Sequence, residues 1–290
     1  MMKKSITYKI SDMVIAINFE HAVEQTERFR SFIVENIVSD YKIEVKCVDE
    51  LPVVKGNEMV HQEEYTVYLQ ESEFIRYYHS YGDKQNYYAV TVWDWENRKA
   101  TINYLPQGKN FFSQSGNMLF HIGLEMILLR EKRLILHAAC VNTKFGGVLF
   151  TGQSGAGKST QADLWVKHRD AFLINGDRPI LSKEENGWKA WGSPYAGSSR
   201  CYVNENCDAS AIVRVIQDSE NKVRRLKGSE AFSVVFSGTT VNDWSREDVS
   251  MASELVIDLI NSVPVYELHC TKNEEAVLIL ENVLKGDILI

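Results

Sequence analysis

The chain lacks several features that define large classes of protein. It has only five prolines among 290 residues, so no proline-rich linker separates its parts. No apolar run approaches the ~20 residues that span a bilayer, and the first residues turn polar before the apolar core of a signal peptide could form. We therefore expect a cytoplasmic protein with no membrane partner.

Cysteine is also scarce, and the 32 basic residues are outnumbered by 39 acidic ones. The five cysteines are odd in number and scattered, and even the closest pair, Cys201 and Cys207, lacks metal-ligand spacing. This pattern is typical of free thiols in a reducing compartment. The net charge of -7 argues against nucleic acid as the main partner, because phosphate backbones select basic surfaces. The charge does not exclude a small anionic ligand, because a few local donors can hold one inside an acidic protein.

The first third of the chain has the pattern of β-strands. From Lys9 to about Leu105, apolar and aromatic residues alternate with polar ones, which predicts an antiparallel meander. One segment, Phe29 to Ile37, has helical spacing instead. The many tyrosines here allow two interpretations: a stacking platform for nucleic acid, or cross-strand packing. The acidic net charge favours packing.

From about Phe111 the pattern changes to alternating helices and strands. Such alternation is the mark of an α/β domain, because each helix returns the chain to the sheet. We predict a smaller β-rich domain over residues 1–110 and an α/β domain over 111–290, with the boundary near 106–116. The predicted helices are 118–129, 158–167, one from about 230, 246–260 and 274–284, and the predicted strands are 134–141, 147–151, 171–174, one near 188, 211–216, 222–226 and 265–268.

The clearest motif is a glycine-rich loop between a strand and a helix. Gly152, Gly157, Lys158 and Ser159 satisfy the pattern G-x-x-x-x-G-K-[ST] directly after the apolar strand Gly147–Thr151. Glycines allow positive φ, so successive N–H groups can point at phosphate oxygens, and the helix that follows adds its positive end. We predict that the loop binds ATP with Mg²⁺, Lys158 contacting the β- and γ-phosphates and Ser159 ligating the metal. The predicted nucleotide contacts are Gly152, Gln153, Ser154, Gly155, Ala156, Gly157, Lys158, Ser159 and Thr160.

Two further residues are candidates for the same site. Asp177 follows the next strand after the loop helix, where a carboxylate could ligate Mg²⁺ or take a proton from an attacking hydroxyl; it could also be a turn residue before Pro179. His137 precedes the loop strand, and a lone histidine in an apolar strand is more often a core residue than a catalyst. Four arginines could contact an anion or could simply be solvated surface residues: Arg178, Arg200, Arg224 and Arg225. The loop 193–201 could cover a substrate or lie at the surface without a function.

Together these residues resemble the catalytic domain of the HPr kinase/phosphorylase family and its HPr-kinase-like serine kinases. The resemblance covers about 134–284 and rests on Leu136-His137-Ala138, the strand 147–151, the loop 152–160 and Asp177. It implies a mixed sheet with helices, a core shared with ATP-type phosphoenolpyruvate carboxykinases. It also implies that metal binding and activation of a serine hydroxyl fall on Asp177 and His137. The 1–110 segment has no comparable resemblance.

The chain departs from the family pattern at two positions. It has Gly176-Asp177 where the family has paired aspartates, and His137-Ala138 where the family has His-Gly. The downstream glycine-rich signature of the bifunctional enzymes has no clear match, so we predict no phosphorylase activity. The leading interpretation is an ATP-dependent kinase that modifies a serine or threonine hydroxyl on a peptide or small protein, with Lys158, Asp177 and His137 as catalytic residues and Ser159 and Asp177 as metal ligands. The alternatives are an ATP-binding sensor without transfer activity and a kinase of a small metabolite. The sequence is also compatible with a homo-oligomer.

Overall fold

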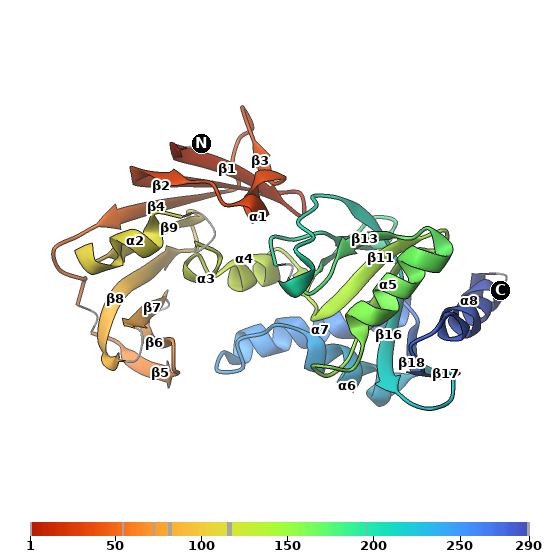
Figure 1. The fold of residues 1–290 in the computed structure, drawn as a ribbon. Coiled ribbons are helices and arrows are strands. Elements are labelled where there is room, and N and C mark those ends of the chain that lie inside the picture. The colour runs from red at the N-terminus through yellow and green to blue at the C-terminus, as the bar shows by residue number, and fades with distance from the viewer. Residues whose placement is uncertain are drawn as a thin grey trace. The chain divides into compact units, whose positions relative to one another are not determined.

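The computed structural model describes residues 2–288 apart from 54, 72, 81–82, 115–117 and 196. Within this part, the chain divides into two compact units, Met1–Leu124 and Glu125–Ile290 (Figure 1). Each unit is built on its own nine-stranded sheet. The fold is therefore mixed α/β, with most of its helix in the second unit. None of the helices in the described part is long and apolar enough to cross a bilayer.

The sheet of the first unit has the strand order β3-β1-β2-β4-β9-β8-β7-β6-β5. Its strands are β1 (Met2–Ile10), β2 (Met13–Glu24), β3 (Ile33–Val34), β4 (Tyr41–Cys47), β5 (Asn57–His61), β6 (Tyr65–Gln70), β7 (Glu73–Ser80), β8 (Asp83–Asp94) and β9 (Lys99–Tyr104). From β5 to β9 each strand pairs antiparallel with the next, as the alternation predicts. The pairs β2–β4 and β4–β9 are parallel, so the prediction of a simple meander is wrong there.

The predicted helix over Phe29 to Ile37 is also wrong beyond its first turn. Only α1 (Glu27–Arg30) is helical, and Ile33 begins the short strand β3. Phe29 and Phe32 are fully buried, whereas Ile37 is about half exposed, at 48%. The apolar spacing therefore came from two aromatic side chains in one turn and not from the face of a continuous helix.

Short helices follow β9: η1 (Pro106–Gly108), α2 (Lys109–Phe112) and α3 (Met118–His121). His121 is fully buried, and its main-chain oxygen accepts from Thr91 Oγ1 at 2.7 Å and from the Tyr78 hydroxyl at 3.1 Å. Tyr88 contacts its ring nitrogen at 2.7 Å. The predicted helix 118–129 is thus two helices, α3 and α4 (Leu124–Arg130), separated at Gly123, whose φ of 58° breaks helical geometry.

The second unit has a mixed sheet in the order β10-β14-β15-β16-β12-β11-β13, with β18 beside β16 and β17 beside β18. Its strands are β10 (Arg133–Ile135), β11 (Ala138–Thr143), β12 (Gly146–Thr151), β13 (Phe172–Asn175), β14 (Ile180–Glu184), β15 (Gly187–Trp191), β16 (Asn206–Gln217), β17 (Lys222–Leu226) and β18 (Val265–Cys270). The longer helices are α5 (Lys158–Arg169), α6 (Gly228–Gly238), α7 (Arg246–Ser262) and α8 (Glu274–Ile288), and η3 (Gly197–Ser199) is a single turn.

The helices of this unit cover both faces of the sheet. Residues of α5 and α8 share one core with alternate residues of β11, β12, β16 and β18. Residues of α6 and α7 share the second core with the intervening residues of these strands and with β10, β14 and β15. Because both faces are covered, the apolar runs are continuous and polar residues appear where the strands end.

Candidate functional site

The strand directions of the second unit bring polar residues to one edge of the sheet. β12, β16 and β18 run parallel to one another, while β11 runs antiparallel to β12 and to β13. The ends of β12, β13, β16 and β18 therefore lie at the same edge as the start of β11. This edge carries the glycine-rich loop after β12, Asp177 after β13 and His137 before β11.

The loop backbone is wide open. Gly152, Gly155 and Gly157 have φ values of 141°, 79° and 101°, a region that side chains with a Cβ rarely adopt. A Cβ built on Gly155 would meet no atom within 4 Å, and Gln153 and Ser154 are exposed. Gly157 caps α5 in the left-handed conformation, so the first N–H groups of a 12-residue helix face the loop. This geometry can hold phosphate oxygens.

Lys158 is the buried cation of the loop. Its residue is only 9% exposed, and its ammonium donates to the main-chain oxygens of Gly152 at 3.0 Å and Gln153 at 3.2 Å. Burial lowers the pKa of Lys158, Arg178 lowers it further, and Asp177 opposes the shift. Neutral carbonyl groups compensate a buried charge only in part, so the position favours an anion. Ser159 is exposed and Thr160 half-buried at the start of α5.

Asp177 is held by a turn built on Asn175. The fully buried Asn175 side chain accepts from the N–H groups of Asp177 at 2.9 Å and Arg178 at 2.7 Å, and donates to the oxygens of Ser193 and Tyr195. Such a side-chain turn fixes the residue two positions on. Asp177 is therefore a turn residue, as one interpretation of the sequence has it, and its charge raises the pKa of Lys158 in the loop. β11 lies between its strand and β12, so the strand before Asp177 is not the immediate neighbour of the loop strand.

His137 meets Asp177 because the antiparallel β11 begins where β13 ends. Their side chains approach at 3.5 Å between Nε2 and Oδ1, and both are partly exposed, at 35% and 28%. Burial lowers the pKa of His137, nearby Lys158 and Arg178 lower it further, and Asp177 opposes them. The imidazole is therefore neutral at pH 7 and can accept a proton. The predicted residues Lys158, Asp177 and His137 thus gather at one edge.

The other predicted anion contacts lie at different places in the second unit. Arg178 belongs to the edge, with its Nε 3.6 Å from Asp177 Oδ2 and its guanidinium donating to Thr240 at 2.9 Å. Arg200 is exposed in the loop 193–201, of which residue 196 lies outside the described part. Gly197 of this loop packs against Asp177, since a Cβ there would come within 3.0 Å of the aspartate side chain. Arg224 joins a network around Glu267 on β18.

No group of three or more histidine, cysteine or acidic side chains among the described residues is arranged to hold a metal ion. The Mg²⁺ ligands that the sequence predicts are the Ser159 hydroxyl and the Asp177 carboxylate, and this stays a prediction. A nucleotide-bound Mg²⁺ also takes phosphate oxygens and water, so two protein oxygens fit its requirements.

Sequence reasoning missed one residue that supports the loop. Gln217, at the end of β16, donates from Nε2 to the Gly155 oxygen at 2.6 Å. Because β16 and β12 are neighbours only in the folded sheet, nothing near the motif in the sequence identifies this contact. The polar residue at the end of an apolar strand is its only local signal.

The first unit contains a cavity of about 820 Å³, lined by Glu63, Glu64, His79, Ser80, Tyr88, Gln107, Gly108, Phe111 and Phe120. Its histidine is already bonded, with ring nitrogens at 2.8 Å from Thr66 Oγ1 and 3.1 Å from the Glu63 oxygen. Burial raises the pKa of Tyr88 well above its ordinary value, so its phenol stays protonated. His79 is thus already bonded and Tyr88 stays neutral, and we take the loop edge of the second unit as the candidate site.

Comparisons with known proteins give a distant structural relative. No family model matches the chain, and neither does any curated protein. Among solved structures, the chain is similar to the HPr(Ser) kinase/phosphatase from Coxiella burnetii, at 14% sequence identity and a TM-score of 0.33. The match covers 53% of this chain and 90% of that chain. At this level the similarity is distant and specifies neither reaction nor substrate.

Proposed function

We propose that this protein is a cytoplasmic ATP-dependent kinase that transfers the γ-phosphate to a serine or threonine hydroxyl of a peptide or small protein. The observation that carries the proposal is the convergence of three groups at one sheet edge. The buried ammonium of Lys158 lies inside an open glycine loop, and the His137–Asp177 pair lies at the same edge. Phosphoryl transfer needs little more than positioning and charge stabilisation, which these groups supply.

Each residue has a defined task in this scheme. The loop N–H groups and Lys158 bind the phosphates, and Ser159 and Asp177 hold Mg²⁺, which when bound neutralises charge on the phosphate oxygens. Asn175 fixes the Asp177 main chain through two hydrogen bonds. The neutral imidazole of His137 stands beside the carboxylate, so the pair offers two proton acceptors to an incoming hydroxyl. In this scheme, His137 takes the role of the second aspartate that the family resemblance would place at Gly176.

A second candidate is an ATP-binding sensor that transfers nothing. The small number of carboxylates at the edge favours it, because Asp177 would have to serve both the metal and the hydroxyl. A sensor would use the same loop and Lys158 for binding, and would leave the γ-phosphate in place. The two candidates therefore differ in transfer and not in nucleotide affinity.

The test uses γ-labelled ATP with Mg²⁺ and three acceptors: HPr, serine-bearing peptides and a cell extract. Lys158→Ala and Asp177→Asn are compared with Lys167→Ala, an exposed lysine on the same helix. We expect label on an acceptor with the wild type and Lys167→Ala, and none with the other two. Label on a small molecule of the extract would instead indicate a metabolite kinase. ATP binding with no transfer and no hydrolysis would contradict the kinase and support the sensor.

A further inference from the structure

A row of polar side chains crosses the sheet beside the glycine loop. In the strand register, Thr151 of β12 lies opposite Arg214 of β16, Arg214 lies opposite Glu267 of β18, and Glu267 lies opposite Arg224 of β17. Residues directly opposite one another point to the same face of a sheet. Thr151 is the last residue before Gly152, and adjacent strands are ~4.8 Å apart, so Arg214 lies one strand away from the base of the loop.

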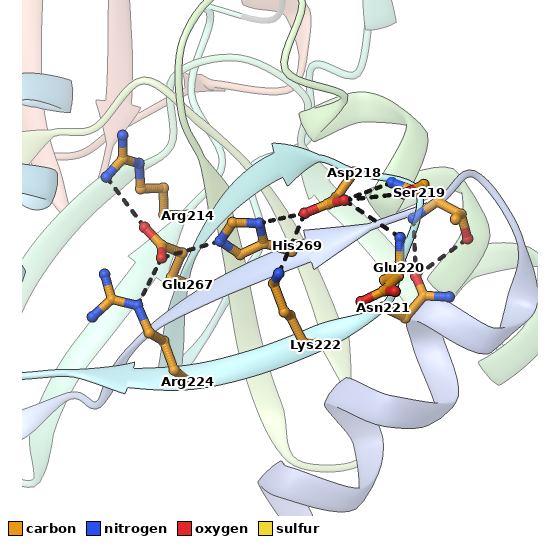
Figure 2. A network of polar contacts seen from close by, with 10 residues as sticks. Arg214, Asp218, Ser219, Glu220, Asn221, Lys222, Arg224, Glu267 and His269 are labelled. Atoms are coloured by element: carbon orange, nitrogen blue, oxygen red, sulfur yellow. Dashed lines mark hydrogen bonds and ion pairs between the residues drawn. The ribbon is translucent and has the colours of Figure 1, made fainter.

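Glu267 is the fixed centre of this row. Its side chain is 6% exposed and accepts from Arg224 Nε at 2.7 Å and from Arg214 at 3.3 Å, and His269 Nε2 lies 3.3 Å from it. Figure 2 shows the carboxylate between the two guanidinium groups. Burial alone would raise the pKa of Glu267, but Arg224 and His269 lower it overall, so the carboxylate stays charged. A buried carboxylate with several donors is a rigid anchor.

The two arginines differ in how much of their hydrogen-bonding capacity is used. Arg224 donates to Glu267 and also to both oxygens of Glu230 at 3.1 Å. Arg214 makes one bond, from a terminal nitrogen, and its side chain is 41% exposed. A guanidinium has five N–H donors, so most of those of Arg214 have no partner within the described part of the chain. One terminal nitrogen of the Arg214 guanidinium is bonded to Glu267, and the remaining N–H groups can donate to a ligand.

The polar residues near the loop lie on both sides of β12 in the sheet. His137 and Asp177 lie on the side of β11 and β13, whereas Arg214 lies on the side of β16. β16 also fixes the loop itself, because Gln217, three residues after Arg214, donates to Gly155. The loop, the proton acceptors and a partly free guanidinium therefore share one edge.

We propose that Arg214 binds the γ-phosphate of the ATP held by the loop, and that Glu267 and Arg224 are positioning residues that hold its guanidinium in place. This assignment rests on the proposed function. Arginine suits the task because its planar fork matches phosphate oxygens and stays charged at every relevant pH. During transfer the acceptor oxygen bonds to Pγ, the bond from Pγ to the ADP oxygen breaks, and the hydroxyl proton goes to His137 or Asp177. Arg214 takes no proton and forms no covalent bond.

Calorimetric titration with two nucleotides tests the assignment on the full chain. AMP-PNP keeps a γ-phosphoryl group that resists transfer and ADP has none, and Mg²⁺ is present with both. For Arg214→Gln we expect at least a tenfold loss of AMP-PNP affinity and ADP affinity within about twofold of wild type, because the variant removes a charged hydrogen-bonded contact that only the γ-phosphoryl group makes. Arg214→Lys should lose less, since it keeps the charge but not the fork.

Two further measurements keep the result interpretable. Arg246→Gln removes an exposed arginine at the start of α7 and should change neither affinity. A melting curve for each variant shows that it is folded, and Arg214→Lys serves if Arg214→Gln is not. Equal losses for AMP-PNP and ADP, or no loss for either, would overturn the assignment while leaving the kinase proposal intact. A wild type that binds neither nucleotide would overturn the proposed function and this assignment with it.

Discussion

The two units contain sheets of equal strand number but use their polar residues in different ways. In the first unit, two groups of polar side chains pair within the unit: Thr66 lies between the rings of His61 and His79, and Tyr88 bonds to His121. In the second unit, polar side chains gather where strands end, and Lys158, Asp177 and Arg214 keep part of their bonding capacity for something else. Internal pairing indicates a structural role, and incomplete pairing at a shared edge indicates a site.

The largest losses of stability should come from substitutions in the hydrophobic cores, and they should be similar in the two units. Ile43→Ala on β4 and Leu259→Ala on α7 each remove a fully buried side chain, and each should lower the free energy of unfolding by ~2–5 kcal/mol. Val38→Ala and Ile257→Ala, at exposed positions, should change it by less than ~0.5 kcal/mol. Urea denaturation measures the change, and amide hydrogen exchange should rise only in the unit that carries the substitution. Faster exchange in both units would show that they are not separate in stability.

A second pair of substitutions separates structural from functional polar networks. Asn175→Ala leaves the N–H groups of Asp177 and Arg178 without their acceptor, at a cost of ~1–3 kcal/mol for each buried group left unpaired. It should also reduce phosphate transfer by at least tenfold, because Asp177 is no longer held. Thr66→Val removes the hydroxyl between two histidines and should cost stability alone, with transfer unchanged. Comparable losses of transfer in both variants would contradict the distinction.

The third prediction concerns acid sensitivity. Hydrogen bonds from Lys144, Arg169 and Lys285 lower the pKa of Glu281 to about 2, against the effect of burial. Because the folded pKa lies below the ordinary value of 4.5, this stabilisation is complete above pH 4.5 and is lost as pH falls towards 2. Glu281→Gln should therefore lower the melting temperature at pH 7 and flatten its fall between pH 5 and 2.

Asp94 in the first unit provides the control for that experiment. The side-chain and backbone hydrogen bonds of Asn97 lower the pKa of Asp94 as well, but this carboxylate is exposed. Exposed pairs contribute little because water and salt screen them. Asp94→Asn should leave the pH profile close to that of the wild type, and an equal flattening in both variants would show that screening by solvent does not distinguish the two carboxylates.

The smallest effect is expected at Gly197. A Cβ there would lie 3.0 Å from the Asp177 side chain, and the φ of 52° strains any other residue. Gly197→Ala should reduce the transfer rate a few-fold by displacing Asp177, with ATP affinity unchanged. Gly187→Ala, also at positive φ but with open space around it, should leave transfer as it is. Loss of ATP affinity in Gly197→Ala would mean that the loop 193–201 supports nucleotide binding directly.

How far the sequence predicts the molecule depends on how local each feature is. The strand before the loop and the helix after it were predicted within two residues at each end, because β12, Gly152–Gly157 and α5 are continuous in the chain. The interruption of helix 118–129 at Gly123 also had a local signal in the glycine, but it was missed. Local pattern identifies an element, and a glycine inside it marks where it can break.

Strand partners are not local, and the failures follow from this. Alternation along β2 and β4 cannot reveal that they pair in parallel, and nothing around Asp177 shows that β11 separates its strand from β12. The row of Arg214 and Glu267 depends on the register of β16 against β18, which joins residues far apart in the chain. A single charged residue inside each apolar strand was the available signal, and without the register each one resembles a solvated side chain.

The antiparallel β11 also has a consequence for how this unit folds. His137 stands at the beginning of its strand and Asp177 beyond the end of another, so the pair cannot meet until β11 is held between β12 and β13. The glycine loop joins a strand and a helix that are adjacent in the chain, and Gln217 of β16 supports it afterwards. Closing the longer segment costs chain entropy that the local turn does not. During synthesis or refolding, we therefore expect the strand, loop and helix to form before the His137–Asp177 contact, which depends on completion of the sheet.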